Sequence, residues 1–306
     1  MKHDILEANT LLQRRLGRRT LFRGVGMAGL GLTGAALLGC NGDDEGSPLE
    51  AARDRGYITI GFANEAPYGF ADESGNVTGE APEVARVILA ELGVPDIQGV
   101  VVTFDSLIPG LQARRFDIIA AGMFINSNRC AEVLFSDPDY CIPQAFGVDA
   151  GNPFGVMNYQ DVANSDATIG VLSGGVEDGY AQAAGIPDDR ITRFSEAPAL
   201  AEGLQARRVD VIAATSLSIR AQLDRLADPN LEMTAGFTPI VDGEPEYGCG
   251  GYGFRRDDQE LRDAFNDVLV SMKQNNEIVP ITEPFGFGET EISAATDVTA
   301  DDLCEA

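Results

Sequence analysis

Apolar runs alternate along the chain with amphipathic segments, and one such pair occurs twice. GLQARRFDIIAA at 110–121 returns as GLQARRVDVIAA at 203–214, identical at ten of twelve positions and displaced by 93 residues. In each copy, leucines at helical spacing precede an Arg-Arg pair, and the apolar run that follows suits a strand buried on both faces. A helix leading into a buried parallel strand is the unit of an α/β sheet, so the repeat predicts two lobes of similar build.

The other apolar runs predict the rest of the α/β fold. Strands are expected at 57–62, 100–104 and 168–172, and amphipathic helices at 81–92 and 257–274. Residues 190–194 and the second copy of the repeat are expected to continue the second lobe. The two copies of the repeat diverge where their strands end. Met123, Phe124, Asn128 and Arg129 follow the first copy, whereas Thr215 and Ser216 follow the second. Ligands bind at the carboxyl ends of strands in open α/β sheets, so the scaffold repeats while the chemistry differs.

The first 39 residues predict an export signal. Arg18-Arg19 precede an apolar, glycine-rich run at 24–39 that is too short for a comfortable bilayer span. RRTLFR resembles a twin-arginine signal, and LLGC ending at Cys40 resembles a bacterial lipobox in which that cysteine becomes the lipidated first residue. A single N-terminal anchor helix is the alternative. Both readings place the body outside the cytoplasm, with residues 40–48 as a polar tether.

The charge balance becomes more acidic once the signal is removed. The chain has 22 basic and 48 acidic residues, and the signal takes six basic and two acidic ones, which leaves a net charge of −30. A field of that sign repels nucleic acid and anionic lipid, so we expect no nucleic-acid role. Lys273 is the one lysine left, and such an acid-rich, lysine-poor surface would suit a salty habitat.

Histidine and cysteine usage narrow the chemistry further. His3 is the only histidine and leaves with the signal, which argues against Ser-His-Asp triads and histidine metal sites. Four cysteines then remain, and an even number in an exported protein suggests two disulfides. Three pairings are possible. We favour Cys130–Cys141, which closes a short loop, and Cys249–Cys304, which ties the acidic C-terminal tail to the body. We expect no metal and no cofactor.

Three motifs together resemble a known family. Phe116-Asp117-Ile118, then Arg129, then FSDPDY at 135–140 are similar to the pattern of bacterial extracellular solute-binding proteins of family 3. The resemblance implies a two-lobed periplasmic-binding-protein fold of type II. Lobe 1 would be discontinuous, 49–147 and 244–306, and lobe 2 would be 148–243. Two hinge crossings near Gly147 and Gly243 would join them, with the ligand held between.

Within this family the chain resembles ectoine- and hydroxyectoine-binding proteins, which hold a zwitterion among three aromatic rings and an arginine. In the first lobe, the resemblance implies that Tyr68, Phe104 and Phe124 are the three rings. It also implies that Arg129 binds the carboxylate and that Glu65 lies beside the cation. It implies second-lobe contacts at the start of a helix: Gly175, Val176 and Glu177. At Val176 the resemblance implies a hydroxyl side chain, so one carboxylate hydrogen bond is missing. Amino-acid binders usually have an Asp where this chain has Thr215.

The chemistry of these residues favours the same ligand. A ring-bound amidinium carries a spread, weakly hydrated charge that aromatic faces hold at about 0.5–2 kcal/mol each. Arg129 can clamp a carboxylate with two parallel hydrogen bonds. Each residue also has a plainer interpretation. Phe104 and Phe124 could be core residues, Arg129 could pair with Asp137 or Glu132, and 173–177 could be only a helix cap.

We therefore expect a lipid-anchored receptor that captures ectoine-type solutes and delivers them to the permease of an ABC importer. We expect it to have no catalytic residues. A polar or cationic amino acid is the alternative ligand. A less favoured alternative is an exported enzyme similar to cyclohexadienyl dehydratase, for which Glu65 and Glu177 are the acid-base candidates near the cleft.

Overall fold

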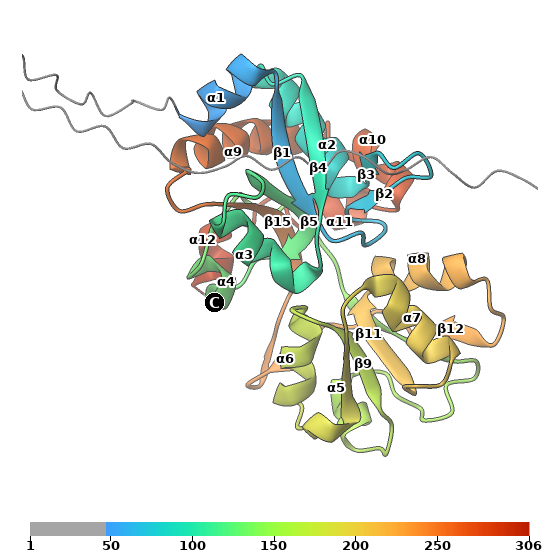
Figure 1. Cartoon of the computed structure of the whole chain (residues 1–306). Coiled ribbons are helices and arrows are strands. Elements are labelled where there is room, and N and C mark those ends of the chain that lie inside the picture. The colour runs from blue at the N-terminus through green and yellow to red at the C-terminus, as the bar shows by residue number, and fades with distance from the viewer. Residues whose placement is uncertain (1–46, 306) are drawn as a thin grey trace, which may run out of the picture. The chain divides into compact units, whose positions relative to one another are not determined.

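The computed structural model describes residues 47–305 (Figure 1). The predicted signal, the lipidation site Cys40 and most of the tether lie outside the described residues. Within 47–305, no helix has both the length and the apolar character needed to cross a bilayer. The described chain folds around two separate main sheets, and we call the elements around each sheet a lobe.

The sheet of the first lobe has the strand order β4-β1-β5-β15-β6, and β7 pairs with β15. Strands β4 and β5 run parallel to β1, and β15 runs antiparallel to β5. The first-lobe strands are β1 (Tyr57–Phe62), β2 (Phe70–Ala71), β3 (Val77–Thr78), β4 (Asp96–Val101), β5 (Ile118–Phe124), β6 (Leu134–Phe135), β7 (Tyr140–Cys141) and β15 (Cys249–Phe254). Its helices are α1 (Pro48–Arg55), α2 (Glu80–Glu91), η1 (Phe104–Ser106), α3 (Leu107–Gln112), α4 (Ser127–Cys130), α9 (Gln259–Gln274), α10 (Val279–Thr282), η3 (Glu283–Phe285), α11 (Glu289–Ser293) and α12 (Ala300–Cys304).

The sheet of the second lobe repeats this plan with the order β10-β9-β11-β8-β12. Strands β10 and β11 run parallel to β9, and β8 runs antiparallel to β11. Its strands are β8 (Gln144–Asp149), β9 (Ile169–Leu172), β10 (Ile191–Phe194), β11 (Val211–Thr215) and β12 (Leu231–Met233). Its helices are α5 (Tyr159–Ala163), α6 (Val176–Ala183), η2 (Asp188–Arg190), α7 (Ala197–Gln205) and α8 (Ser216–Leu226). A small hairpin, β13 (Ile240–Val241) and β14 (Glu244–Pro245), precedes β15.

The repeated segment ends in the central parallel strand of each sheet, as its apolar run predicts. Alternate residues of β5 pack into two different hydrophobic cores, and alternate residues of β11 do the same in the second lobe. Both strands are therefore buried on both faces, which explains why their sequences show a continuous apolar run. The prediction of two lobes built on one plan agrees with the two sheet orders.

The shared spacing inside the two copies of the repeat has a structural reason. Before β5, Asp117 accepts hydrogen bonds from both the backbone N–H and the hydroxyl of Thr59. Before β11, Asp210 accepts the same pair of bonds from Thr168. In each lobe an aspartate thus pins the central strand to its parallel neighbour. The Arg-Arg pair supplies the turn ahead of it, where Arg114 and Arg207 both have a φ of +55°.

Two elements differ from the sequence prediction. The strand expected at 100–104 is β4, which starts earlier and ends at Val101, so Phe104 lies in the 3-10 turn η1 instead. β4 is an edge strand with mostly exposed residues, so no apolar run marks its start. The acidic segment after α9 folds into α10, η3, α11 and α12, and Phe287 from this segment is fully buried.

The first crossing between the sheets differs from the expected one. Gly147, near which the crossing was expected, lies inside β8 and pairs with Ile212 of the second sheet. The chain changes sheets at 142–143, between β7 and β8, and returns between β12 and β15. Gly243 lies in the β13–β14 hairpin on this return path, close to the predicted second crossing. The apolar residues at 145–148 would suit a buried strand in either sheet. The hydrophobic pattern alone therefore could not show to which sheet the segment belongs.

The favoured disulfide pairing is wrong. Cys141 of β7 is bonded to Cys249 of β15, and Cys130 of α4 is bonded to Cys304 of α12. Strands β7 and β15 are antiparallel neighbours in which Cys141 and Cys249 are register partners. Distance along the chain therefore misled the prediction, because the return of β15 to the first sheet decides which cysteines meet.

Candidate functional site

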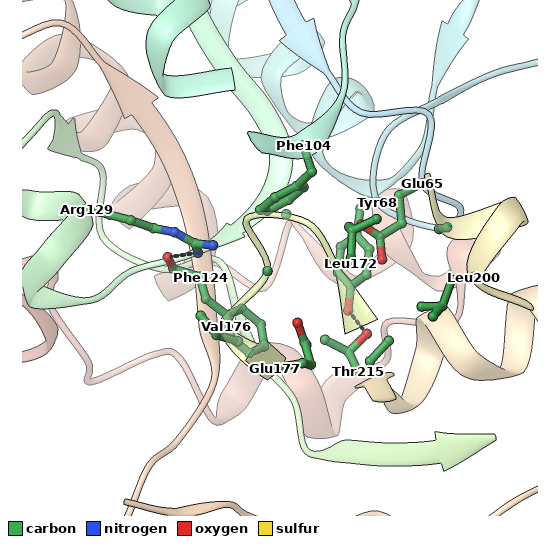
Figure 2. A pocket seen from close by; sticks show the side chains of 14 residues that line it. Glu65, Tyr68, Phe104, Phe124, Arg129, Leu172, Val176, Glu177, Leu200 and Thr215 are labelled. Carbon is green, nitrogen blue, oxygen red and sulfur yellow. Dashed lines mark hydrogen bonds between the residues drawn. The ribbon is translucent and has the colours of Figure 1, made fainter. Parts of the chain in front are cut away.

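A cavity at the carboxyl ends of β5, β9 and β11 lies between residues of both lobes (Figure 2). The space between its walls is about 450 Å³, part of it open to solvent. Its walls are formed by Glu65, Tyr68, Phe104, Gly122, Phe124, Arg129, Leu172, Gly175, Val176, Glu177, Ala197, Leu200, Ala214 and Thr215.

The structure brings together all nine residues that the sequence singled out as ligand contacts: Glu65, Tyr68, Phe104, Phe124, Arg129, Gly175, Val176, Glu177 and Thr215. Sequence reasoning missed five lining residues: Gly122, Leu172, Ala197, Leu200 and Ala214. Leu172 and Ala214 lie at the ends of buried strands, so the strand-end rule could have found them. Ala197 and Leu200 belong to α7 and carry no signal beyond that of a helix with an apolar face.

A tight loop after β1 positions Glu65 and Tyr68. The backbone of Glu65 exchanges hydrogen bonds with Gly69 at 2.9 and 3.1 Å, and its carbonyl also accepts the Tyr68 N–H at 2.9 Å. The Tyr68 ring packs against Phe287 and Tyr140, at centroid distances of 5.3 and 5.5 Å. The buried C-terminal segment therefore supports the wall of the cavity.

Gly122 makes room for this ring. Its φ is +61°, and a Cβ at this position would lie 2.1 Å from Cδ1 of Tyr68. Both the backbone conformation and the contact require glycine. Any side chain at residue 122 would displace the Tyr68 ring from the wall.

The two phenylalanines are buried and serve more than the cavity. Phe104 starts η1 and Phe124 ends β5, and each also belongs to a hydrophobic core of the first lobe. Phe124 is 6% exposed and lies 6.4 Å from the Tyr140 ring. Each of these residues therefore packs in a hydrophobic core and also forms part of the cavity wall.

Arg129 connects the two lobes. Its Nη1 donates to the carbonyl of Phe124 at 2.6 Å, and its Nη2 donates to the carbonyl of Gly174 in the second lobe at 2.8 Å. The ion pair with Asp137 or Glu132 considered from the sequence is not among the salt bridges of the described residues. A guanidinium has five N–H donors, so these two bonds leave donors that can hold an anion. Burial lowers the pKa of Arg129, which still remains a cation at neutral pH.

Two carboxyl groups face the same cavity from opposite lobes. Burial raises the pKa of Glu65 to about 7, against the hydrogen bond that it accepts from Ser218, and the nearby charge of Glu177 adds to the rise. Burial also raises the pKa of Glu177, against its own backbone N–H and the charge of Arg129. Because α6 begins with Gly175 as its N-cap and has no side-chain cap, its first turn presents Glu177 beside free N–H groups.

The arrangement can bind a small molecule that carries both charges. Rings and carboxyl groups suit a cation, and Arg129 with the start of α6 suits an anion. Among residues 47–305 there is no group of three or more His, Cys, Asp or Glu side chains that could hold a metal ion.

The match to a protein family spans most of the described chain. The family of bacterial extracellular solute-binding proteins, family 3, matches residues 58–289. The chain belongs to this family. Its membership agrees with the two-lobed fold and makes the protein a solute-binding protein, as the three sequence motifs predicted.

Similar proteins include a curated bacterial relative and two proteins of known structure. A probable amino-acid ABC transporter periplasmic-binding protein of Sinorhizobium fredii is 36% identical over 259 residues, or 84% of this chain and 85% of the relative. The crystal structure of EhuB in complex with hydroxyectoine has a TM-score of 0.77 and 38% identity, and covers 84% of this chain and 97% of that one. The ancestral amino acid-binding protein AncCDT-1, a precursor of cyclohexadienyl dehydratase, has a TM-score of 0.67 and 25% identity, with coverage of 78% and 99%.

Proposed function

We propose that this solute-binding protein captures compact zwitterions of the ectoine and hydroxyectoine type and delivers them to an ABC importer. The observation that carries the proposal is the composition of the cavity. Three aromatic rings, a guanidinium and two carboxyl groups surround a space suited to a small molecule. The similarity to EhuB, whose structure contains hydroxyectoine, supports the same solute class. The transporter assignment is supported by the name of the Sinorhizobium relative.

In this proposal each charge of the solute has a partner. The amidinium ring lies among Tyr68, Phe104 and Phe124 and donates its N–H groups to Glu65. The carboxylate takes the remaining N–H donors of Arg129 and the backbone N–H groups around Gly175. The Val176 side chain contacts the solute but has no hydroxyl to donate a hydrogen bond. Binding of the solute's carboxylate therefore depends more heavily on Arg129.

Calorimetric titration of the exported domain with ectoine and hydroxyectoine tests the proposal, with glutamine and arginine as competitors. We expect saturable binding of an ectoine-type solute that neither amino acid displaces at equal concentration. Tight binding of glutamine or arginine without ectoine binding would contradict it.

A cationic amino acid is the second candidate. Two carboxyl groups and one guanidinium would be balanced by a ligand with two cationic groups and one carboxylate, provided both Glu65 and Glu177 are ionised. The pKa of Glu65 is raised to about 7, so at neutral pH this carboxyl is protonated in part of the protein molecules. The charge balance with a doubly cationic ligand is then less favourable. The name of the Sinorhizobium relative favours an amino acid.

We propose binding rather than catalysis, although AncCDT-1 is described as a precursor of an enzyme. Residues 47–305 contain no histidine, and Glu65 and Glu177 are the acid-base candidates in the cavity. Recovery of an unchanged solute after prolonged incubation with the protein supports this view. Conversion of a prephenate-like acid would contradict it.

We also propose, from sequence alone, that a lipid on Cys40 anchors the protein at the outer face of the membrane. Metabolic labelling with a fatty acid should mark the wild type and not the Cys40→Ser variant. Equal labelling of both would contradict the anchor.

A further inference from the structure

The start of α8 makes two hydrogen bonds across the cleft. The Tyr68 hydroxyl of the first lobe donates to Oγ1 of Thr215 at 2.6 Å, a bond drawn in Figure 2. One helical turn later, the Ser218 hydroxyl donates to Oε1 of Glu65, also at 2.6 Å. All four side chains are buried. We call these four residues the α8 latch.

The latch occupies polar groups that a ligand could otherwise use. Oγ1 of Thr215 also accepts the backbone N–H of Ser218 at 3.2 Å and so caps α8. Ser218 is the side chain that donates to the Glu65 carboxylate. A ligand group that entered between Glu65 and α8 would have to break a short buried bond and leave a hydroxyl without a partner.

Apolar side chains close the same end of the cavity. Leu200 of α7 and Ala214 of β11 line it and are buried. Figure 2 shows Leu200 and Thr215 on the same side of the cavity as Tyr68 and Glu65. A longer ligand would find the hydroxyls in this part of the wall already hydrogen-bonded within the α8 latch.

The opposite end is built differently. Arg129, Gly175 and Val176 line the cavity and also line a second, more open hollow. Asn126, Asn128, Tyr180, Val241 and Glu246 continue that hollow beyond Arg129. The cavity is thus shut at α8 and continues past Arg129, so its usable length is set at the α8 end.

We propose that Ser218, through the α8 latch, is a specificity-determining residue that limits ligand length and excludes amino acids with a long cationic side chain. The inference rests on the proposed function, because it assumes a zwitterion anchored at Arg129. An ectoine-sized ring ends at Glu65. An arginine held by its carboxylate would have to carry its guanidinium into the space that Ser218 and Leu200 occupy.

The test is a ratio of affinities. Dissociation constants for ectoine and L-arginine are measured for the wild type, Ser218→Ala and the double variant Tyr68→Phe/Ser218→Ala. The substitution Tyr68→Phe removes the hydroxyl but keeps the ring, and Thr215 still caps α8. We expect the double variant to shift the ratio towards arginine at least tenfold, with a smaller shift for Ser218→Ala. Thermal unfolding and circular dichroism confirm that each variant folds.

Ser216→Ala is the matched control. Ser216 lies in the same helix two residues earlier, and its hydroxyl makes no hydrogen bond among the described residues. We expect its ratio to equal that of the wild type. A ratio for the double variant within twofold of wild type would overturn the role of the latch.

The two proposals fail in different ways. If the wild type binds another compact zwitterion such as L-proline and not ectoine, the solute assignment fails, and the latch is tested with L-proline in place of ectoine. If the wild type binds L-arginine more tightly than any compact zwitterion, the latch proposal is overturned.

Discussion

The guanidinium of Arg129 lies over the ring of Phe104, with 5.4 Å between Cζ and the ring centroid. A cation of the protein therefore covers a ring that the sequence assigned to the solute. The same guanidinium bonds to the second lobe at Gly174. Arg129 consequently has two tasks, holding the lobes together and facing the cavity, and variants at this position should affect both.

Replacing Arg129 by Lys should weaken solute binding nearly as much as replacing it by Ala, at least tenfold in both cases. Lysine keeps the charge, but it cannot bond Phe124, Gly174 and a carboxylate at once from one planar group. Calorimetric titration of the three proteins checks this expectation. A lysine variant that binds like the wild type would show that charge alone is required.

Replacing Gly174 by Ala should prevent full closure of the lobes. A Cβ at this residue would lie 2.8 Å from Cα of Asp105, which belongs to the other lobe. We expect at least a tenfold loss of affinity. Thermal stability should fall only by about the 1 kcal/mol that a positive φ costs an alanine.

Gly151→Ala provides the control for Gly174→Ala. Gly151 has nearly the same φ, +83° against +78°, but a Cβ added there would have no neighbouring atom within 4 Å. Its substitution should cost similar stability and leave affinity unchanged. Equal affinities of the two variants would show that the contact with Asp105 does not limit closure.

Binding of a cationic group should strengthen as the pH rises from 6 to 8. The pKa of Glu65 is about 7 because of burial, so its ionised share, and with it the attraction for a cation, increases on the order of tenfold across this range. Titrations at several pH values check the slope. Glu65→Gln should bind more weakly and lose most of the dependence, whereas Glu177→Gln should retain it. An unchanged slope in Glu65→Gln would assign the effect elsewhere.

Without solute, the contribution of Glu65 to folding stability should decrease as the pH rises, whereas its contribution to binding increases. A carboxyl whose pKa is raised on folding takes up a proton relative to the unfolded chain. Its contribution to the free energy of unfolding is fully present below the ordinary pKa of 4.5 and is lost as the pH rises through the folded-state pKa of about 7.

A second pair of acidic residues is buried in the first lobe. Glu80 is 0% exposed and Asp139 is 1% exposed, and each carboxyl group influences the pKa of the other. Burial and the neighbouring Asp139 raise the pKa of Glu80, and burial raises the pKa of Asp139. The groups facing Asp139 include Tyr252 and Lys273, and Nζ of Lys273 donates to the carbonyls of Pro138 and Ala295.

Glu80→Gln should therefore make thermal stability less dependent on pH. Both pKa values are raised, so the wild-type pair favours folding at low pH and this contribution is lost as the pH rises. Glutamine can donate to Asp139 without taking up a proton, so the variant should be at least as stable at pH 8. Melting temperatures from pH 5 to 8 check this, with the exposed Glu91→Gln of the same helix as control. Parallel curves for Glu80→Gln and wild type would contradict a pH-dependent contribution from this pair.

The sequence by itself determined the parts of the fold that local pattern encodes. β1, β9 and α9 lie within a residue or two of the predicted ranges, because an apolar run or a helical period reports burial directly. The repeat predicted the two central strands. The strand-end rule and the family resemblance together identified nine residues that line one cavity, and their contacts with a solute stay predictions.

Tertiary structure alone decided which distant segments meet. The return of β15 to the first sheet fixed Cys141–Cys249, and the folding of the acidic C-terminal segment fixed Cys130–Cys304 and placed Phe287 behind Tyr68. In the α8 latch, the two hydrogen bonds join residues that are 147 and 153 positions apart in the sequence. Local pattern reports how much of a residue is buried but not against what. The two disulfides and the Phe287–Tyr68 contact depend on how the first lobe folds, and the α8 latch depends on how the two lobes meet.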